Sequence, residues 1–439
     1  MTEQLKTPAL EQCYQHFLDT LAARGFKGDI AADDANRIVL ATDNSIYQRL
    51  PRAVIYPRDA DDIILLASLA GESAFADVIL APRGGGTGTN GQSLTDGLMV
   101  DVTRYMHHII DIDVDNRRVR VQAGVVKDQL NAALKPFGLF FAPELSTSNR
   151  ATIGGMISTD ACGQGSRAYG KTRHHVLELD VALLGGERFV SRPIDDAELE
   201  VQCARTGRIG EVHRCARHII DTRLEQIERV FPPLNRSLTG YDLAHLRTED
   251  GLFDLNSVLC GSEGSLGFLM EATLNVLPLP KYSALINVRY AGFMDALRDA
   301  RALMGSDDSP DAPTSIETID DRVLMLAMED IIWDGVAEYF PAGAEGSAPV
   351  RGINLVEFND NDEVSLKRRV ERFTRTLEQD RDVRRLGHTI AWGRERITTV
   401  YGMRKRAVGL LGNARGEKRP IPFIEDTAVP PEQLSLIHI

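Results

Sequence analysis

The chain has 439 residues, enough for two or three domains with sizeable cores. Its 63 acidic side chains outnumber its 50 basic ones, and the net charge of −13 argues against nucleic acid or an anionic membrane surface as the main partner. No apolar run is long enough to span a membrane, and the N-terminus has no apolar signal core. Five scattered cysteines, with no C-x-x-C pair, are typical of reduced thiols, so we expect a cytoplasmic protein.

The N-terminal third begins with helical patterns. Residues 5–24 predict a helix with Gly25 as a C-cap, and residues 51–57 predict a short strand between two prolines. A second helix is expected from near Asp59 to about Ala70, because its first turn is acidic and apolar residues share one face. The apolar run at 78–80 then predicts a buried strand.

A dense glycine loop follows that strand. Glycines allow backbone N–H groups to approach an anionic ligand together, and an arginine adds a charge with fork geometry suited to phosphate. Short hydrogen-bonding side chains complete the loop. The stretch therefore predicts a phosphate cradle, with a tight glycine turn as the minority alternative; its residues are Arg83, Gly84, Gly85, Gly86, Thr87, Gly88, Thr89 and Asn90.

The loop also contains the dinucleotide pattern G-x-G-x-x-G, at Gly86, Gly88 and Gly91. That fingerprint requires a helix directly after the glycines. Here residues 92–97 are short and polar, and residues 98–102 read as another strand. The sequence therefore predicts no Rossmann fold, and no Gly-Lys-Ser/Thr follows to make a P-loop.

The middle of the chain predicts a hairpin at 110–122, a helix around 130–137 ended by Gly138, and a strand at 176–184. Between them, residues 143–170 form a long stretch rich in Gly, Ser, Thr and Asn, which favours a functional loop over a solvated one. An amphipathic helix is expected across 212–227. His213 and Cys215 lie two residues apart on it, so we expect no zinc there, a buried Cys215 and partly exposed histidines.

Residues 257–278 predict a third glycine-rich turn followed by a strand. Beyond Pro280 the glycines thin out. Strands at 285–290 and 353–358 alternate with helices at 293–304 and 364–377, which indicates a second, α+β domain, with residues 341–349 as a surface loop.

The three glycine stretches, in this order, resemble the vanillyl-alcohol-oxidase (VAO/PCMH) type of FAD-binding fold. PRGGGTGTNG looks like its pyrophosphate loop, ATIGGMISTDACGQGSRAYG like the segment along the flavin, and GSEGSLGFL like the adenine-side loop. The resemblance implies an α+β fold: a two-subdomain PCMH-type FAD-binding domain followed by an incomplete α+β cap (substrate) domain. We accordingly divide the chain into an N-terminal helical segment (1–50), the FAD-binding domain (51–280), the cap (281–434) and a tail of foreign appearance (435–439).

The resemblance also implies which residues contact FAD. Some relatives attach FAD through a histidine in the first loop; this chain has Thr87 there, so we expect noncovalent FAD. Besides the eight residues of the first loop, the expected contacts are Pro143, Ser146, Thr152, Gly154, Gly155, Ser158, Thr159, Gly163, Tyr169, Gly170, Glu263, Gly264, Gly267 and Phe268.

A narrower resemblance extends over almost the whole chain. The stretches ATDNSIYQRLP, FAPELSTSNRATIGGM and YGMRKRAVGLLGNARGEKRPIPFIEDTAVPP are similar to the large YdiJ-like FAD and iron–sulfur proteins, which resemble D-2-hydroxyglutarate dehydrogenases. This implies oxidation of a D-2-hydroxy acid. The family's histidine-rich catalytic and metal-binding stretch and its iron–sulfur domain come after the point where this chain stops. We therefore expect an N-terminal fragment, inactive by itself, with the catalytic base downstream of Leu434.

The expected partners are a small 2-hydroxy acid and an unidentified electron acceptor. Such a substrate needs a cation for its carboxylate. The resemblance places Arg404 there, although a solvated basic helix face is about as good a reading, and Lys405, Arg406 and Arg419 are weaker candidates. The histidine pairs at 107–108 and 174–175 read as surface or supporting residues. Two rival functions remain: D-lactate or glycolate dehydrogenase, and a noncatalytic FAD-binding subunit.

Overall fold

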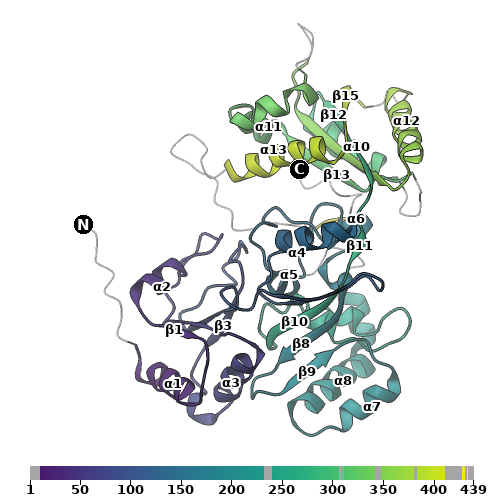
Figure 1. Cartoon of the computed structure of the whole chain (residues 1–439). Helices are drawn as coiled ribbons and strands as arrows, with labels where there is room; N and C mark the ends of the chain where they lie inside the picture. Colours follow the sequence, from purple (N-terminus) through teal and green to yellow (C-terminus); the bar gives the residue numbers. More distant parts are fainter. Residues whose placement is uncertain are drawn as a thin grey trace. The chain divides into compact units, whose positions relative to one another are not determined.

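The computed structural model describes residues 10–231, 240–305, 309, 311–341, 348–379, 383–410, 428–430 and 433. These residues form two compact units (Figure 1). The first contains the described residues of 10–162 and 171–278, and the second contains 163–170 and the described residues from 279 onward. The tail at 435–439 and most of the loop at 341–349 lie outside the described residues.

The first unit opens with a four-stranded sheet in the order β1-β2-β4-β3. β1 is antiparallel to β2, whereas β2 and β3 both run parallel to β4. Helices α1 and α3 bury apolar side chains against this sheet. The elements are α1 (Gln12–Ala23), β1 (Asp29–Ala31), α2 (Asp34–Val39), β2 (Ala53–Tyr56), α3 (Ala60–Ala70), β3 (Leu80–Arg83) and β4 (Leu98–Asp101).

The helix ends in this part follow the predicted signals. Gly25 has a φ of 90° and donates to Ala22 O, while Phe26 N donates to Leu21 O, which together close α1 in a Schellman arrangement. Asp59 caps α3 by accepting from Asp62 N. The N-terminal segment is not only helical, however, because β1 adds a strand to the first sheet.

The strand before the glycine loop lies two residues later than predicted, at 80–83 instead of 78–80. Pro82 therefore lies inside it, which is possible because β3 is an edge strand and a proline removes one ladder donor. β3 pairs with β4 from Leu80↔Leu98 to Arg83↔Asp101, and no helix occupies residues 84–97 between them. The strand–loop–strand context that argues against a Rossmann fold is confirmed.

A five-stranded antiparallel sheet completes the first unit, in the order β5-β6-β10-β8-β9. The predicted hairpin is confirmed, with Asp111 opposite Arg120 and Asp113 opposite Arg118. Helices α7 and α8 lie beside β8 and β9 (Figure 1) and share a core with this sheet. The elements are β5 (Ile109–Asp113), β6 (Arg118–Gln122), α4 (Lys127–Leu134), β7 (Leu139–Phe140), α5 (Ile153–Ser158), β8 (Val176–Ala182), β9 (Arg188–Ser191), α7 (Asp196–Ala204), α8 (Gly207–Val230), α9 (Asn256–Leu259), β10 (Phe268–Asn275) and β11 (Leu277–Pro278).

Two predictions for this unit are wrong. Residues 143–170 are not one loop, because they contain α5 and the short helix α6 (Ser166–Tyr169). On α8 the burial is the reverse of the prediction: His213 is buried and Cys215 is exposed. His213 lies four residues after Ile209 and three before Ala216, on the stripe that faces the core.

The second unit is a four-stranded antiparallel sheet, ordered β13-β14-β12-β15, with helices on both faces. Helices α11 and α13 cover one face, and α10 and α12 cover the other. The two strands and two helices predicted here are confirmed, while β13, α11, β15 and α13 are additional. The elements are β12 (Tyr282–Tyr290), α10 (Phe293–Met304), β13 (Ser315–Asp320), α11 (Asp321–Met328), β14 (Gly352–Asp360), α12 (Glu363–Gln379), β15 (Arg385–Trp392) and α13 (Arg394–Leu410).

Candidate functional site

The first glycine segment presents a row of unpaired backbone donors. Within the described residues, the N–H groups from Gly84 to Thr89 donate to no acceptor, whereas the next amide, of Asn90, donates to Gln92 Oε1 at 3.0 Å. The loop is held instead through a carbonyl, since Gly86 O accepts from Asn44 N. Consecutive amides without a protein acceptor need water or a ligand in that role, and a row of this kind can accept an anion.

Arg83 does not act as predicted. Its side chain is 8% exposed, and its Nη1 and Nη2 donate to Leu40 O (3.2 Å) and Thr42 O (2.9 Å). Burial lowers the pKa of its guanidinium, and the nearby Asp101 carboxylate opposes that shift. The guanidinium thus fixes the chain at 40–42 behind the loop, and its terminal nitrogens are not presented as a fork to a phosphate.

The second glycine segment packs directly on the first. Thr152 caps α5 by accepting from Gly155 N at 3.1 Å and is fully buried. A Cβ on Gly84 would overlap Thr152 Oγ1, and one on Gly85 would overlap the carbonyl oxygen of Arg150. Glycine is therefore required at 85, where the loop meets the Arg150 backbone, and at 84 there is no room for a Cβ beside the capping side chain of Thr152.

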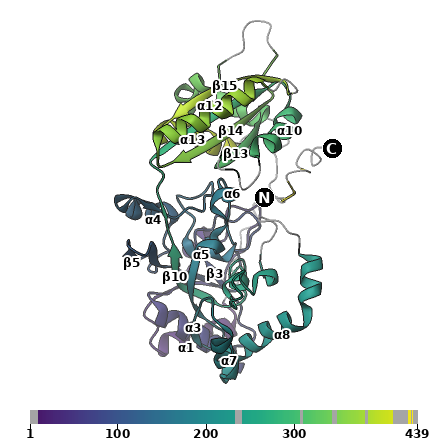
Figure 2. The same ribbon diagram turned by 90° about the vertical axis from the view of Figure 1, so that its right-hand side faces the viewer.

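The third glycine segment contacts both of the others. Gly261 N donates to Ile157 O at 2.8 Å, and Glu263 N donates to Ser158 O at 2.9 Å. A Cβ on Gly264 would overlap the ring of Pro82, at the end of β3. Figure 2 shows α5 beside β10 and β3, so three segments far apart in the sequence meet in the first unit.

The other residues predicted to contact FAD differ in their burial and contacts. Pro143 is buried, whereas Ser146 is exposed. Thr159 Oγ1 donates to Gly155 O at 3.1 Å, Gly154 packs on Ala123, and Gly267 packs on β8. Phe268 begins β10 with its side chain buried. Gly163, Tyr169 and Gly170 are not gathered with the rest in the first unit, because residues 163–170 belong to the second, where Asn359 Nδ2 donates to Tyr169 OH.

The sequence analysis missed a partly buried ion pair next to the second segment. Lys127, at the start of α4, places its Nζ 2.5 Å from Glu144 Oε2, and its N–H donates to Ala151 O. Its neighbour Asp128 N donates to Ser148 O. No spacing in the sequence links residues 17 apart across a strand, so this contact could be found only in the fold.

The gathered segments fit the pyrophosphate of FAD. The six free amides supply donors without a competing side-chain acceptor, and glycines at 84, 85 and 264 keep the loop closely packed on its supports. Thr87, Gly88 and Thr89 are half-buried and Asn90 is exposed, so this loop borders solvent. No helix in the described parts of the chain is both long and apolar enough to cross a membrane.

In the second unit, Arg404 lies on α13 and forms an ion pair through Nη2 with Glu317 Oε2 on β13. The Arg404 side chain is 29% exposed and that of Glu317 17%. One turn earlier, Tyr401 OH donates to Glu357 Oε2 at 2.9 Å. Arg406 pairs with Asp330, and Arg419 lies outside the described residues. Arg404 is therefore not on a freely solvated face.

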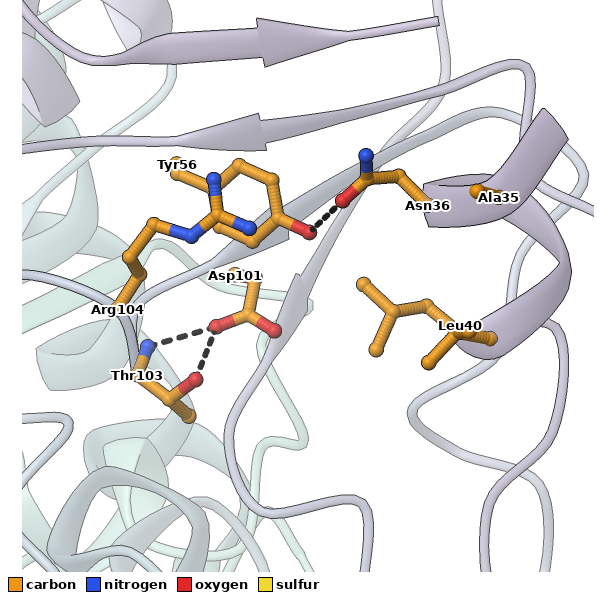
Figure 3. A pocket seen from close by; sticks show the side chains of 8 residues that line it. Ala35, Asn36, Leu40, Tyr56, Asp101, Thr103 and Arg104 are labelled. Atoms are coloured by element: carbon orange, nitrogen blue, oxygen red, sulfur yellow. Dashed lines mark hydrogen bonds between the residues drawn. The ribbon is translucent and has the colours of Figure 1, made fainter. Parts of the chain in front are cut away.

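A separate hollow of about 460 Å³ lies beside α2, where β2 and β4 end (Figure 3). Asp101 Oδ1 accepts there from Thr103 N (2.7 Å) and Oγ1 (2.6 Å), and Arg104 stacks on the Tyr56 ring. Burial raises the pKa of Asp101. None of the residues predicted to bind FAD or substrate lines this hollow.

Comparison with known families gives two matches. Residues 51–191 match the FAD binding domain, and residues 279–438 match the C-terminal domain of FAD linked oxidases.

Curated relatives agree with these matches. A D-2-hydroxyglutarate dehydrogenase of Pseudomonas putida is 64% identical over 99% of this chain and 42% of its own length, and that of Escherichia coli is 46% identical over 98% and 42%. Glycolate oxidase subunit GlcD of Bacillus subtilis is 26% identical over 92% of this chain and 70% of its own length. The chain thus spans about two fifths of the dehydrogenases it matches.

Among solved structures, alkyldihydroxyacetonephosphate synthase superposes with a TM-score of 0.61 at 16% identity, over 89% of this chain and 63% of that one. At this identity the likeness concerns the fold alone.

Proposed function

Because this chain belongs to the FAD-linked oxidoreductases of the VAO/PCMH type, we propose that it forms the flavin-binding part and cap of a dehydrogenase for D-2-hydroxy acids. D-2-hydroxyglutarate, oxidised to 2-oxoglutarate, is the best candidate substrate. The observation that carries the proposal is the meeting of three glycine segments around six free backbone amides, in a chain whose relatives include D-2-hydroxyglutarate dehydrogenases.

Bound FAD would supply the redox chemistry, as the acceptor for the hydride of the hydroxy acid's 2-carbon. The chain's own residues bind and orient. We assign the amides of 84–89 to the pyrophosphate and the second and third segments to the rest of the cofactor. With Thr87 in the place where some relatives carry a linking histidine, the FAD is noncovalent.

Arg404 is our candidate for the substrate carboxylate. Glu317 occupies one terminal nitrogen of its guanidinium, and the partly exposed side chain retains other N–H donors for a second carboxylate. We assign no catalytic base within the described residues. His175 and His213, for example, are buried among core side chains and serve packing.

We further propose that electrons leave the flavin through an iron–sulfur centre carried by residues outside this chain, which fits the greater length of the dehydrogenases it matches. All five cysteines here are free thiols, in keeping with a proposed cytoplasmic location. Glycolate is the second candidate substrate, because GlcD of Bacillus subtilis is similar over most of this chain.

The test is anaerobic reduction of the bound flavin in the complete enzyme. D-2-hydroxyglutarate should bleach the flavin absorbance rapidly, while its L-enantiomer, D-lactate and glycolate should act at least ~10-fold more slowly, a difference of ~1.4 kcal/mol or more in the barrier. Faster bleaching by glycolate would transfer the assignment to the second candidate, and no bleaching by any of them would leave a noncatalytic FAD-binding protein.

The mode of attachment is tested on the same sample. Acid precipitation should leave the yellow colour in the supernatant. Flavin fluorescence that stays with the protein through denaturing electrophoresis would contradict noncovalent binding.

A further inference from the structure

Four charged side chains form a buried cluster in the first unit, next to the gathered glycine segments. Asp160, Lys171, Arg173 and Asp242 are 3–10% exposed, and their two negative and two positive charges balance. Lys171 Nζ lies 2.5 Å from Asp160 Oδ2, and Arg173 pairs with Asp242 through Nη1. We call these four residues the charge cluster.

The charge cluster includes Asp160 of the second glycine segment and lies beside the third segment. Asp160 follows α5 and adopts a φ of 47°, unusual for a residue other than glycine. A Cβ on Gly261, in the third segment, would lie 3.5 Å from Asp160 Cβ and 2.7 Å from the backbone N of Gly240. Asp242 thus follows a stretch that touches the third segment, and Tyr241 OH is hydrogen-bonded to Ser265 Oγ there.

The charge cluster also closes a loop. Thr172 donates to Ala161 O through both its N–H (3.1 Å) and its hydroxyl (2.6 Å), and Arg173 N donates to Asp160 Oδ1 at 3.0 Å. Residues 163–170, between these anchors, belong to the second unit. Asp160 and Lys171 therefore fix the points where the chain leaves the first unit and returns to it.

Stability alone does not account for this arrangement. Buried ion pairs lose about as much by desolvation as they gain by attraction, so apolar side chains of similar size would hold the region together equally well. Four mutually paired charges also fix one specific geometry, because each must meet a defined partner or remain buried and unpaired. Here the partners come from three places in the chain: within the second glycine segment, directly after it, and in the stretch around residue 242 that contacts the third.

We propose that the charge cluster positions the flavin site, with Asp160 as the central positioning residue. Its carboxylate holds Lys171 and the backbone of Arg173, and through Arg173 and Asp242 it fixes the third glycine segment relative to α5. This inference rests on the proposal that FAD lies along the three glycine segments. It predicts that FAD affinity depends on the charge cluster beyond its effect on stability.

The first variant is Asp160→Asn. Asparagine tolerates a positive φ and can still accept from Arg173 N, so the change removes the charge that pairs with Lys171 and, at 3.9 Å, with Arg173 Nε, while the shape of the side chain is kept. Lys171 is then buried opposite a neutral side chain. We expect a lower melting temperature of the apoprotein and a dissociation constant for FAD at least ~10-fold higher.

The decisive variant is the double change Asp160→Asn with Lys171→Met. It leaves no unpaired charge at that position, so the melting temperature of the apoprotein should return close to that of the parent. The directional contact is still missing. We therefore expect the dissociation constant for FAD to stay several-fold higher, and the fluorescence of bound flavin to be quenched to a different extent.

A matched control is Asp299→Asn. Asp299 is equally buried, pairs with the buried Arg385 at 2.7 Å, and lies on α10 in the second unit, outside the three glycine segments. This variant should lower the melting temperature while leaving FAD affinity unchanged.

The inference is overturned if FAD affinity follows melting temperature across all three variants, or if the double variant binds FAD like the parent. A double variant that does not fold overturns it too, since the charge cluster would then be a stability element. A further variant, Gly85→Val, distinguishes failure of the positioning role from failure of the proposed FAD site. If that change leaves FAD affinity intact, the first loop is not the cradle and the proposed site fails; if it weakens binding and the double variant does not, only the positioning role fails.

Discussion

At the scale of single residues, Gly85 and Arg83 both serve the packing of the first glycine loop, whereas the sequence analysis assigned both to phosphate binding. Gly85 is required because a Cβ there would overlap the carbonyl oxygen of Arg150, and the amides of residues 84–89 have no acceptor within the described residues. Arg83, the only cationic residue in the stretch 83–90, donates its guanidinium hydrogen bonds to two backbone carbonyls. We therefore propose that the loop binds the pyrophosphate by backbone dipoles, without a charged side chain at its head.

Arg404 can be tested by a change that keeps its charge. A guanidinium can hold Glu317 with one nitrogen and a substrate carboxylate with others, which a lysine ammonium cannot do in the same geometry. In the complete enzyme, Arg404→Lys should raise KM for D-2-hydroxyglutarate ~10-fold, ~1.4 kcal/mol, and leave flavin absorbance unchanged.

The matched control for Arg404 is Arg406→Lys. Arg406 lies on the same helix, is exposed and pairs with Asp330. Its replacement should leave KM unchanged. If Arg404→Lys behaves like this control, Arg404 serves only to join α13 to β13.

At the scale of elements, the sequence predicts what periodicity and turn chemistry determine. The hairpin at 109–122 and the helices at 60–70 and 293–304 follow from alternation, acidic first turns and apolar stripes. β13 and β15 escape prediction because their inward side chains are partly polar. Glu317 on β13 meets Arg404, and Thr389 on β15 donates to Tyr339 O. Such contacts exist only between elements distant in sequence, as do the meetings of the three glycine segments.

Burial of His213 on α8 makes the stability of the folded protein depend on pH. The ring lies between Phe189 and Phe253, and its Nδ1 is 2.7 Å from Ile209 O. Burial lowers the pKa of His213 below the ordinary ~6.5. Just below that pH, His213 is therefore protonated in the unfolded chain but still neutral in the folded protein. The contribution to stability is complete above ~pH 6.5 and is lost as pH falls toward the folded-state pKa.

The measurement is urea unfolding at pH 7.5 and 5.5 for the parent and His213→Gln. The parent should lose more stability on acidification than the variant, because glutamine has no proton to gain. Burial lowers the pKa of His174, to about 4, and of His245 as well, so some slope should remain in the variant. His218→Gln, on the exposed face of α8, is the matched control. Equal slopes for parent and His213→Gln would mean that the ring is not enclosed as described.

At the scale of the whole molecule, the two units have separate apolar cores. Three clusters of buried apolar side chains belong to the first unit and two lie on the faces of the second unit's sheet; among the described residues, none belongs to clusters of both units. The second unit has its own buried ion pair. Asp299 is fully buried, accepts from Arg385 Nε and Nη2 at 2.7 Å each, and accepts from Tyr290 OH at 2.6 Å. FAD and a change at Asp299 should therefore act on different cores.

Calorimetry of the 439-residue chain tests this separation. Two unfolding transitions are expected. FAD at ~100 times its dissociation constant should stabilise the transition of the first unit by ~2.7 kcal/mol, because most of the assigned contacts lie there. Asp299→Asn removes the charge that pairs with the buried Arg385. It should lower the unfolding free energy of the other transition by ~3–5 kcal/mol while the FAD-dependent shift persists. A single transition moved by both FAD and Asp299→Asn would show that the two cores unfold together, and that the cofactor's stabilisation is shared by the unit that carries Arg404.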